Sequence, residues 1–181
     1  MKYFTPTDDC SHAGAHKEFI SGQRTGEYVC EACGNSWTSE ASLENAQDQY
    51  RRKKQLEEIA KLPASELSYD QLMIAPTNKV AESIQQRAYD QVADLINGNY
   101  ISALMAKTNA FGWSLDTFDI DQDSIKISKS EISCTGNVQF AGEQDEDKAD
   151  YGDIISGTVE IVIDSTMKIE LVVKELDLEE N

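Results

Sequence analysis

The sequence predicts an α+β protein in three segments. These are a cysteine-containing N-terminal segment over residues 1–38, a helical segment over residues 39–112 and an acidic antiparallel β domain over residues 113–181. Apolar residues recur every three to four positions in the middle segment, as in helices, and every second position in the last, as in strands. The charge balance also changes near residue 113. Residues 39–113 hold 8 basic and 10 acidic residues, whereas residues 114–181 hold 5 basic and 18 acidic residues.

The composition excludes several classes of protein. The 181 residues carry 16 Lys and Arg against 33 Asp and Glu, a formal net charge of −17, which disfavours nucleic-acid binding driven by net charge. A hydrophobic fraction of 40% is typical of globular proteins. No stretch approaches the roughly 18 apolar residues of a membrane-spanning helix. The N-terminus lacks the apolar core of a secretory signal, so we expect a cytoplasmic protein.

Three of the four cysteines lie in the N-terminal segment and predict a metal site. Cys30 and Cys33 are followed by a glycine, and a C-x-x-C-G turn places two thiolates on one side of a tight loop. Upstream, Cys10 and His12 supply a third thiolate and an imidazole. Three Cys and one His complete a tetrahedral zinc site and leave no open position, so we expect one structural Zn²⁺.

Residues 8–38 resemble a zinc ribbon, in which two metal-binding turns are joined by a β-hairpin. Gly22 and Gly26 supply turn signals for that hairpin. The second turn, with Cys30 and Cys33, matches the ribbon pattern closely, whereas the first is C-x-H instead of C-x-x-C. His16 is therefore an alternative fourth ligand. The resemblance implies a protein partner in transcription, replication or assembly complexes.

A C-x-x-C pair can also form a disulfide or act as a redox pair. A disulfide would need an oxidising compartment, and no export signal is present. A thioredoxin-like redox pair would need a βαβ context, whereas the segment is short and rich in turns. Energetics also favour zinc, because a 38-residue segment buries little apolar surface and structural zinc contributes roughly 10–16 kcal/mol in such peptides.

The middle segment predicts two long helices. The first covers residues 39–62 and ends at Pro63, and a capping box begins a short helix over residues 68–74. The second covers residues 77–96, with a break before residues 100–107. Its core-facing stripe consists of Val80, Ile84, Ala88, Val92, Leu95 and Ile96. The proline-bounded connection between the long helices predicts an antiparallel helical hairpin.

One basic run lies within the first predicted helix. Four consecutive helical residues spread over about 300° of the circumference and form no single face. The two lysines of the run stand four residues before two glutamates, a spacing that favours ion pairs. We interpret the run as a solvated, internally paired surface. Direct nucleic-acid binding is the alternative, with contacts from Lys17, Arg24, Arg51, Arg52, Lys53 and Lys54.

The last segment predicts an antiparallel meander of four to six strands with one solvated face. Asp164 and Ser165 form a predicted tight turn between the last two strands, and Cys134 is expected to be a partly buried free thiol. The alternating runs are residues 124–128, 132–134, 138–140, 158–163 and 167–173.

Two acidic clusters lie in the same segment. Residues 119–123 begin like a calcium loop, but Ser124 stands where glycine is required and Ser130 where glutamate is expected, which excludes an EF-hand and leaves a looser cation site as an alternative. Residues 143–153 predict a solvated hairpin loop. Alternatively, this cluster presents an acidic surface to a basic protein, through Asp145, Glu146, Asp147 and Asp150.

No catalytic motif accompanies these features. The sequence lacks G-x-S-x-G, a Walker loop and G-x-G-x-x-G, and both histidines lie in the metal-binding segment. We therefore expect a non-catalytic zinc-binding interaction or adaptor protein within a larger, nucleic-acid-processing type of assembly. The alternatives are direct nucleic-acid binding, an acidic decoy that inhibits a basic protein groove, and a metal-dependent enzyme. Homo-oligomers are also compatible with the helical stripes.

Overall fold

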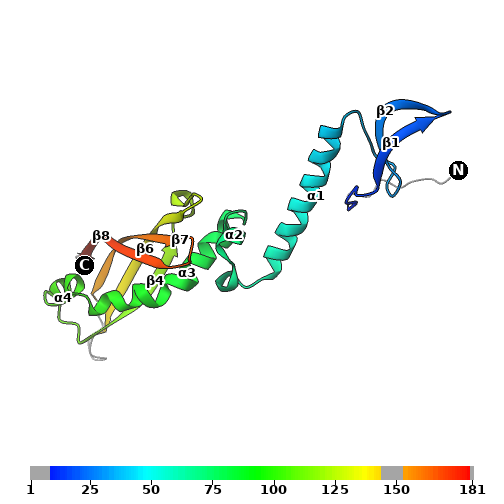
Figure 1. Cartoon of the computed structure of the whole chain (residues 1–181). Coiled ribbons are helices and arrows are strands. Elements are labelled where there is room, and N and C mark those ends of the chain that lie inside the picture. Colours follow the sequence, from blue (N-terminus) through cyan, green and yellow to red (C-terminus); the bar gives the residue numbers. More distant parts are fainter. Residues whose placement is uncertain (1–8, 144–152, 180–181) are drawn as a thin grey trace. The chain divides into compact units, whose positions relative to one another are not determined.

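The computed structural model describes residues 9–143 and 153–179, and the contacts divide the chain into two compact units, residues 1–61 and 62–181 (Figure 1). The described residues form a mixed α/β structure with two antiparallel sheets and four α-helices. The three ranges predicted from the sequence do not coincide with these units. The first long helix groups with the N-terminal sheet, so the boundary falls at its end.

The first unit combines a small sheet with one long helix. Strands β1 (Ala15–Ile20) and β2 (Gln23–Cys30) form an antiparallel hairpin, and β3 (Ser36–Trp37) pairs with β2. The hairpin turn, Ser21–Gly22, has positive φ angles of 53° and 80°, as a two-residue type I′ turn requires. Helix α1 (Glu40–Lys61) follows directly. The Ser39 hydroxyl caps its start by accepting a 3.2 Å hydrogen bond from the backbone N–H of Ser42.

The second unit is built on a five-stranded antiparallel sheet. Its path is β4-β6-β7-β8, and β5 also pairs with β6. Side chains of β6 alternate between buried and partly exposed along the strand, so one face of the sheet points into a core. The strands are β4 (Gly112–Ile120), β5 (Lys126–Ile127), β6 (Glu131–Glu143), β7 (Ile154–Asp164) and β8 (Ile169–Glu179).

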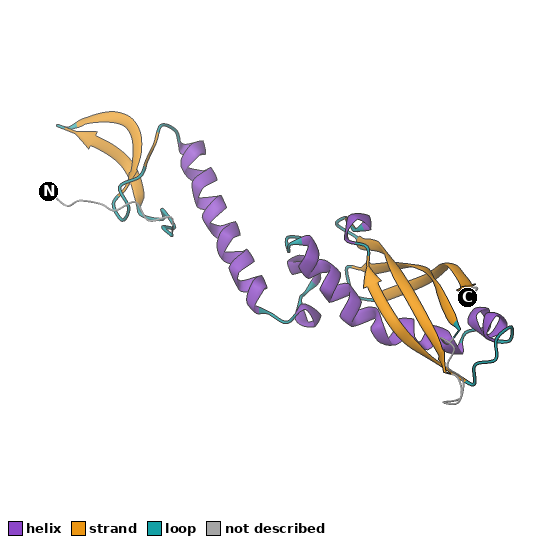
Figure 2. Ribbon diagram, turned by 180° about the vertical axis from the view of Figure 1, so that it is seen from behind, coloured by secondary structure: helices purple, strands orange, loops and turns teal. Residues whose placement is uncertain are grey.

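Helices of the second unit cover the buried face of the sheet (Figure 2). Helix α2 (Tyr69–Leu72) begins with the predicted capping box at Ser68 and Gln71. Helix α3 (Thr77–Ala93) begins after Pro76 and packs against β4, and α4 (Asn99–Met105) follows the predicted break. The core between helix and sheet contains the first four residues of the predicted stripe and side chains of the strands, among them Val80, Ile84, Ala88, Val92, Phe118, Phe140, Ile155 and Ile161.

The two long helices lie in different units, so the predicted helical hairpin is not a unit of this structure. Helix α1 belongs to residues 1–61, whereas α3 packs on the sheet of residues 62–181. An apolar stripe specifies that a helix face must be covered, and either a second helix or a sheet can cover it. The sequence pattern did not distinguish these two coverings.

Two strands differ from the alternation seen in the sequence. β4 was missed because the register shifts between Leu115 and Thr117, and this bulge interrupts the period of two. β6 runs unbroken through Gly136, although the pattern suggested two separate runs. A Cβ at Gly136 would lie 2.7 Å from a ring carbon of Phe118, so the glycine leaves room for this ring against the strand.

Two further predictions about the second unit concern a turn and a thiol. The turn predicted at Asp164 is present, because its carboxylate accepts hydrogen bonds from the backbone N–H groups of Thr166 (2.8 Å) and Lys168 (3.0 Å). Cys134 is a free, buried cysteine.

In the described part of the chain, we find no helix with the length and apolar character needed to cross a membrane.

Candidate metal centre

The turn that follows β2 presents two cysteines from one tight loop. The backbone N–H of Gly34 donates to the carbonyl of Cys30 at 2.8 Å, and the N–H of Cys30 donates to the carbonyl of Asn35 at 2.9 Å. Gly34 has a φ of 76°, which residues with a Cβ rarely adopt. The turn holds the side chains of Cys30 and Cys33 on the same side, as the C-x-x-C-G pattern predicted.

The second pair of residues comes from the loop before β1, where Cys10 and His12 lie two positions apart. His12 has a positive φ of 55°, and its carbonyl accepts hydrogen bonds from the N–H of Ala15 (3.1 Å) and from the side-chain amide of Gln47 (3.0 Å). The ring of His12 packs edge-on against Trp37, with centroids 4.7 Å apart. Helix α1 and β3 therefore both help to position this loop.

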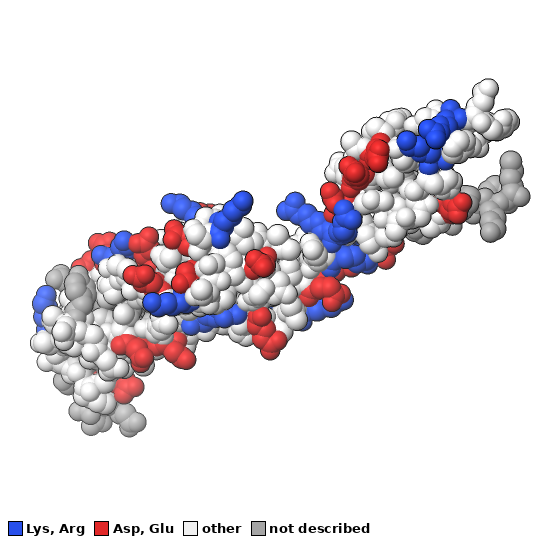
Figure 3. Space-filling view, viewed as in Figure 1, with Lys and Arg blue, Asp and Glu red and all other residues white. Residues whose placement is uncertain are grey.

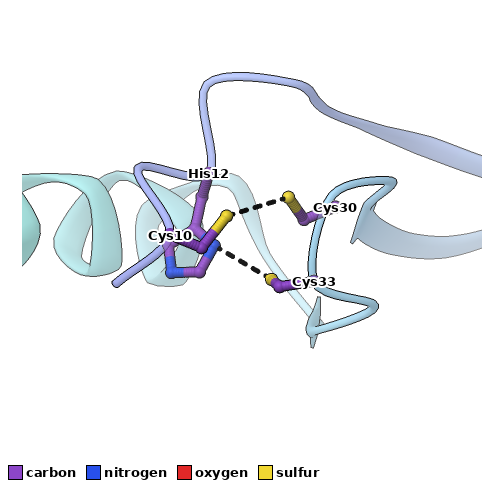
Figure 4. A group of neighbouring side chains, drawn as sticks. All are labelled: Cys10, His12, Cys30 and Cys33. Carbon is purple, nitrogen blue, oxygen red and sulfur yellow. Dashed lines mark hydrogen bonds between the residues drawn. The ribbon is translucent and has the colours of Figure 1, made fainter. Parts of the chain in front are cut away.

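These two loops bring four metal-binding atoms together (Figure 4). The sulfurs of Cys10 and Cys30 are 3.7 Å apart, and Nδ1 of His12 lies 3.4 Å from the sulfur of Cys33. All four ligand atoms lie within 4.8 Å of one another, so the group could hold a metal ion. Cys30 and Cys33 are buried, whereas Cys10 and His12 are half-buried.

The two thiols of the C-x-x-C turn differ in acidity. Burial raises the pKa of Cys30, but hydrogen bonds from the His12 ring and from the backbone N–H groups of Cys33 and Ala32 outweigh it and lower the pKa to about 6. Burial raises the pKa of Cys33 to about 11, and the neighbouring thiols add to that increase. Of these two thiols, Cys30 is therefore the first to ionise, and binding of a cation at Cys33 would release a proton.

His16 is not part of the cluster. It lies in β1, with an exposed side chain, and its Nε2 is 3.9 Å from a carboxylate oxygen of Glu31. Both histidines were compatible with the spacing from Cys10. The path of the loop, which turns at His12, decides which imidazole faces the cysteines.

A cavity adjoins the cluster on the side of helix α1. It has a volume of about 270 Å³, and Cys10 and His12 form part of its wall. The rest of the wall is contributed by Asn35 and by the α1 residues Ala46, Gln49, Tyr50 and Lys53.

The basic residues that the sequence offered as nucleic-acid contacts are spread over the β1–β2 hairpin and α1 of the first unit. On the hairpin, the Lys17 ammonium lies over the Tyr28 ring and the Arg24 guanidinium over the Phe19 ring. Figure 3 shows basic side chains on the hairpin and along α1, interspersed with acidic ones.

On α1, the ion pairs differ from those predicted. Arg51 pairs with Asp48, and Lys54 pairs with Glu57 (3.0 Å) and Asp9 (2.8 Å), so none of these three pairs has the expected four-residue spacing. Arg52 and Lys53 form no ion pair with any described residue. Two of the four bases are therefore neutralised by neighbouring acids, and the helix surface that they share carries charges of both signs.

The acidic surface suggested by Asp145, Glu146, Asp147 and Asp150 lies outside the described residues. The first acidic cluster, residues 119–123, lies within the described part of the chain. The Asp121 carboxylate accepts a hydrogen bond from the N–H of Asp123 at 3.1 Å, which caps the 3₁₀ turn Gln122–Ser124. This is a local turn contact.

Sequence reasoning missed two residues that contact the metal cluster. Trp37 follows the C-x-x-C-G turn and Gln47 lies within a helix rich in polar residues, so the sequence around neither one indicates this role. Both act through His12, so their role depends on contacts across the unit.

Comparison of the chain with protein-family models, with curated proteins and with solved structures gave no match.

Proposed function

We propose that Cys10, His12, Cys30 and Cys33 bind one zinc ion that holds the first unit together, and that the chain is a non-catalytic interaction protein. The proposal rests on the distances within the cluster. With Zn–S about 2.3 Å and Zn–N about 2.0–2.1 Å, a tetrahedral site places two sulfurs about 3.8 Å apart and a sulfur and a nitrogen about 3.6 Å apart. The observed distances of 3.7 Å and 3.4 Å agree with these values.

The donor set supports a structural zinc ion. Three sulfurs and one imidazole nitrogen are soft and borderline ligands, which favour zinc over calcium or magnesium. Four protein ligands fill a tetrahedral shell, whereas catalytic zinc keeps one position for water or substrate. The first unit also needs the metal, because apart from the cysteines its described part buries few apolar side chains, namely Leu43 and Ile59.

The β1–β2 hairpin supports the interaction role. Phe19 and Ile20 stand next to the turn with 57% and 58% of their surfaces exposed. The Arg24 guanidinium lies over the Phe19 ring, and phenylalanine and arginine are both enriched in protein interfaces relative to the rest of the surface. We infer that the hairpin contacts a protein in a larger assembly, and that the zinc ion fixes the loops from which the hairpin extends.

Direct nucleic-acid binding has less support. The hairpin holds Lys17 and Arg24 but also Glu18 and Glu27, so its net charge is zero. Fluorescence anisotropy of a labelled single-stranded oligonucleotide at low salt tests this alternative. Binding that weakens steeply with salt and disappears in a Lys17→Gln/Arg24→Gln variant would replace the protein partner with a nucleic acid.

Metal content of the purified full chain tests the zinc site. We expect one zinc ion per chain in the wild type and in His16→Ala, loss of zinc in Cys30→Ser and weakened binding in His12→Ala. His16→Ala is the matched control, because it removes a histidine from the same segment but outside the cluster. Retention of zinc in His12→Ala together with its loss in His16→Ala would contradict the assigned ligand set.

The contact role has its own test. A Phe19→Ser/Ile20→Ser variant that keeps its zinc should lose an associated protein that the wild type retains during purification. Val172→Ser is the control, since Val172 is also exposed (43%) but lies in β8 of the second unit. Equal retention by both variants would contradict a contact through the hairpin.

A further inference from the structure

The four ligands of the metal cluster differ in how far a small molecule can reach them. Cys30 and Cys33 have 0% and 1% of their surfaces exposed, which protects both sulfurs. Cys10 is half-buried and forms part of the wall of the 270 Å³ cavity described above. A peroxide or another small electrophile therefore has access to one cysteine of the cluster.

The sulfurs of Cys10 and Cys30 are in contact, 3.7 Å apart (Figure 4). A disulfide needs the sulfurs to approach to about 2.05 Å, a movement of less than 2 Å. The two residues are far apart in sequence, so a disulfide between them would close the whole hairpin into a loop.

We propose that Cys10 is a site of oxidative modification, and that its oxidation by a peroxide leads to a Cys10–Cys30 disulfide with release of the metal. This inference rests on the proposed zinc site. The Cys10 thiolate attacks a peroxide oxygen and forms a sulfenic acid, and the other oxygen leaves as water after protonation. The Cys30 thiolate then attacks the Cys10 sulfur, a bond to sulfur forms, and hydroxide leaves and is protonated to a second water.

The electrons and atoms of this reaction balance. Two thiolates, one hydrogen peroxide and two protons give one disulfide and two waters, so the peroxide accepts both electrons. The disulfide sulfurs are no longer anionic ligands. His12 and Cys33 alone cannot hold zinc in a closed tetrahedral site, and the ion is released.

The cavity offers a way to test access without removing a ligand. Ala46 lies on α1 in the cavity wall, so Ala46→Phe should fill the space in front of Cys10. Ala41 lies on the same helix, is exposed and does not line the cavity, which makes Ala41→Phe the matched control. Both variants should bind as much zinc as the wild type. We expect peroxide to release zinc several-fold more slowly from Ala46→Phe than from the wild type or Ala41→Phe.

The experiment uses the full zinc-loaded chain in a Cys134→Ser background, so that only cluster cysteines can pair. Zinc content is measured first, and its release by peroxide is then followed with a chromogenic chelator. Cleavage after glutamate separates the cysteines into residues 1–18, 28–31 and 32–40, so mass spectrometry identifies each pairing. We expect one Cys10–Cys30 disulfide for each zinc ion released.

The outcomes separate the two proposals. Absence of zinc before peroxide is added contradicts the proposed zinc site and with it the modification. Zinc that is present but released with a Cys30–Cys33 or Cys10–Cys33 disulfide overturns the modification alone. Equal rates of release in Ala46→Phe and Ala41→Phe overturn the role of the cavity as the route to Cys10.

Discussion

The ring of His12 packs edge-on against the indole of Trp37, with ring centroids 4.7 Å apart and an angle of 66° between the planes. His12 belongs to the loop before β1, and Trp37 lies in β3, after the C-x-x-C-G turn. The contact thus joins the loop of Cys10 and His12 to the strand that follows the turn of Cys30 and Cys33. It also fixes the imidazole with Nδ1 toward Cys33.

Removal of the Trp37 ring should weaken zinc binding. Groups that orient a metal ligand typically affect metal affinity by about 10–100-fold when they are removed. We expect Trp37→Ala to lie near the lower end of that range, because the contact is packing and not a hydrogen bond. Competition with a chelator measures the affinity. Trp37→Phe keeps an aromatic ring against His12 and should stay close to the wild type, and an equal loss in both variants would contradict the prediction.

Gly34→Ala should also weaken the zinc site. The φ of 76° places Gly34 in the left-handed region, where a residue with a Cβ costs about 1–2 kcal/mol. Zinc affinity should fall about tenfold, as read by the same competition. Gly14→Ala is the control, because Gly14 lies in the same unit, has no positive φ and has no atom within 4 Å of an added Cβ. A matching loss in Gly14→Ala would show that the effect does not come from the turn.

Gly157→Ala should destabilise the second unit. A Cβ on Gly157 would meet the backbone of β8, where the Cα of Leu176 would be 2.8 Å away. Backbone cannot move aside as a side chain can, so the free energy of unfolding should fall by about 1–3 kcal/mol. Urea denaturation followed by circular dichroism measures it. Gly112→Ala should have a smaller effect, because an added Cβ there meets the flexible carboxylate of Glu143.

The stability of the second unit should fall in alkali because of Cys134. Burial, with a smaller contribution from the charge of Asp121, raises the pKa of this thiol from 9.0 to about 12. Below about pH 9 the thiol is protonated in both states. Above it the unfolded chain loses this proton while the folded chain keeps it, so unfolding becomes easier until about pH 12.

Denaturation of the wild type and of Cys134→Ala at several alkaline pH values tests this prediction. Above pH 9 the free energy of unfolding of the wild type should fall relative to that of Cys134→Ala, by up to about 1.4 kcal/mol for each pH unit. Parallel curves for the two proteins across that range would contradict it. A thiol reagent gives a second measurement, because native Cys134 should react only after unfolding.

The sequence predicted those parts of the structure that depend on near neighbours in the chain. The capping box at Ser68 and Gln71 and the turn at Asp164 depend on contacts within four residues, and both are present. The stripe on α3 also follows from local spacing, because positions three and four apart share a helix face. The same reasoning brought Cys30 and Cys33 together on one turn.

Tertiary structure alone decided which histidine faces the cysteines and what packs on the apolar helix. His12 and His16 stand two and six positions after Cys10, and either spacing allows a ligand. Contacts from Trp37 and Gln47 hold only His12 in place. The apolar stripe of α3 could pack against either a helix or a sheet. The strand that it packs against, β4, was not predicted because its bulge interrupts the alternation of apolar residues. In each case the deciding contact joins residues far apart in sequence, and local periodicity carries no information about such contacts.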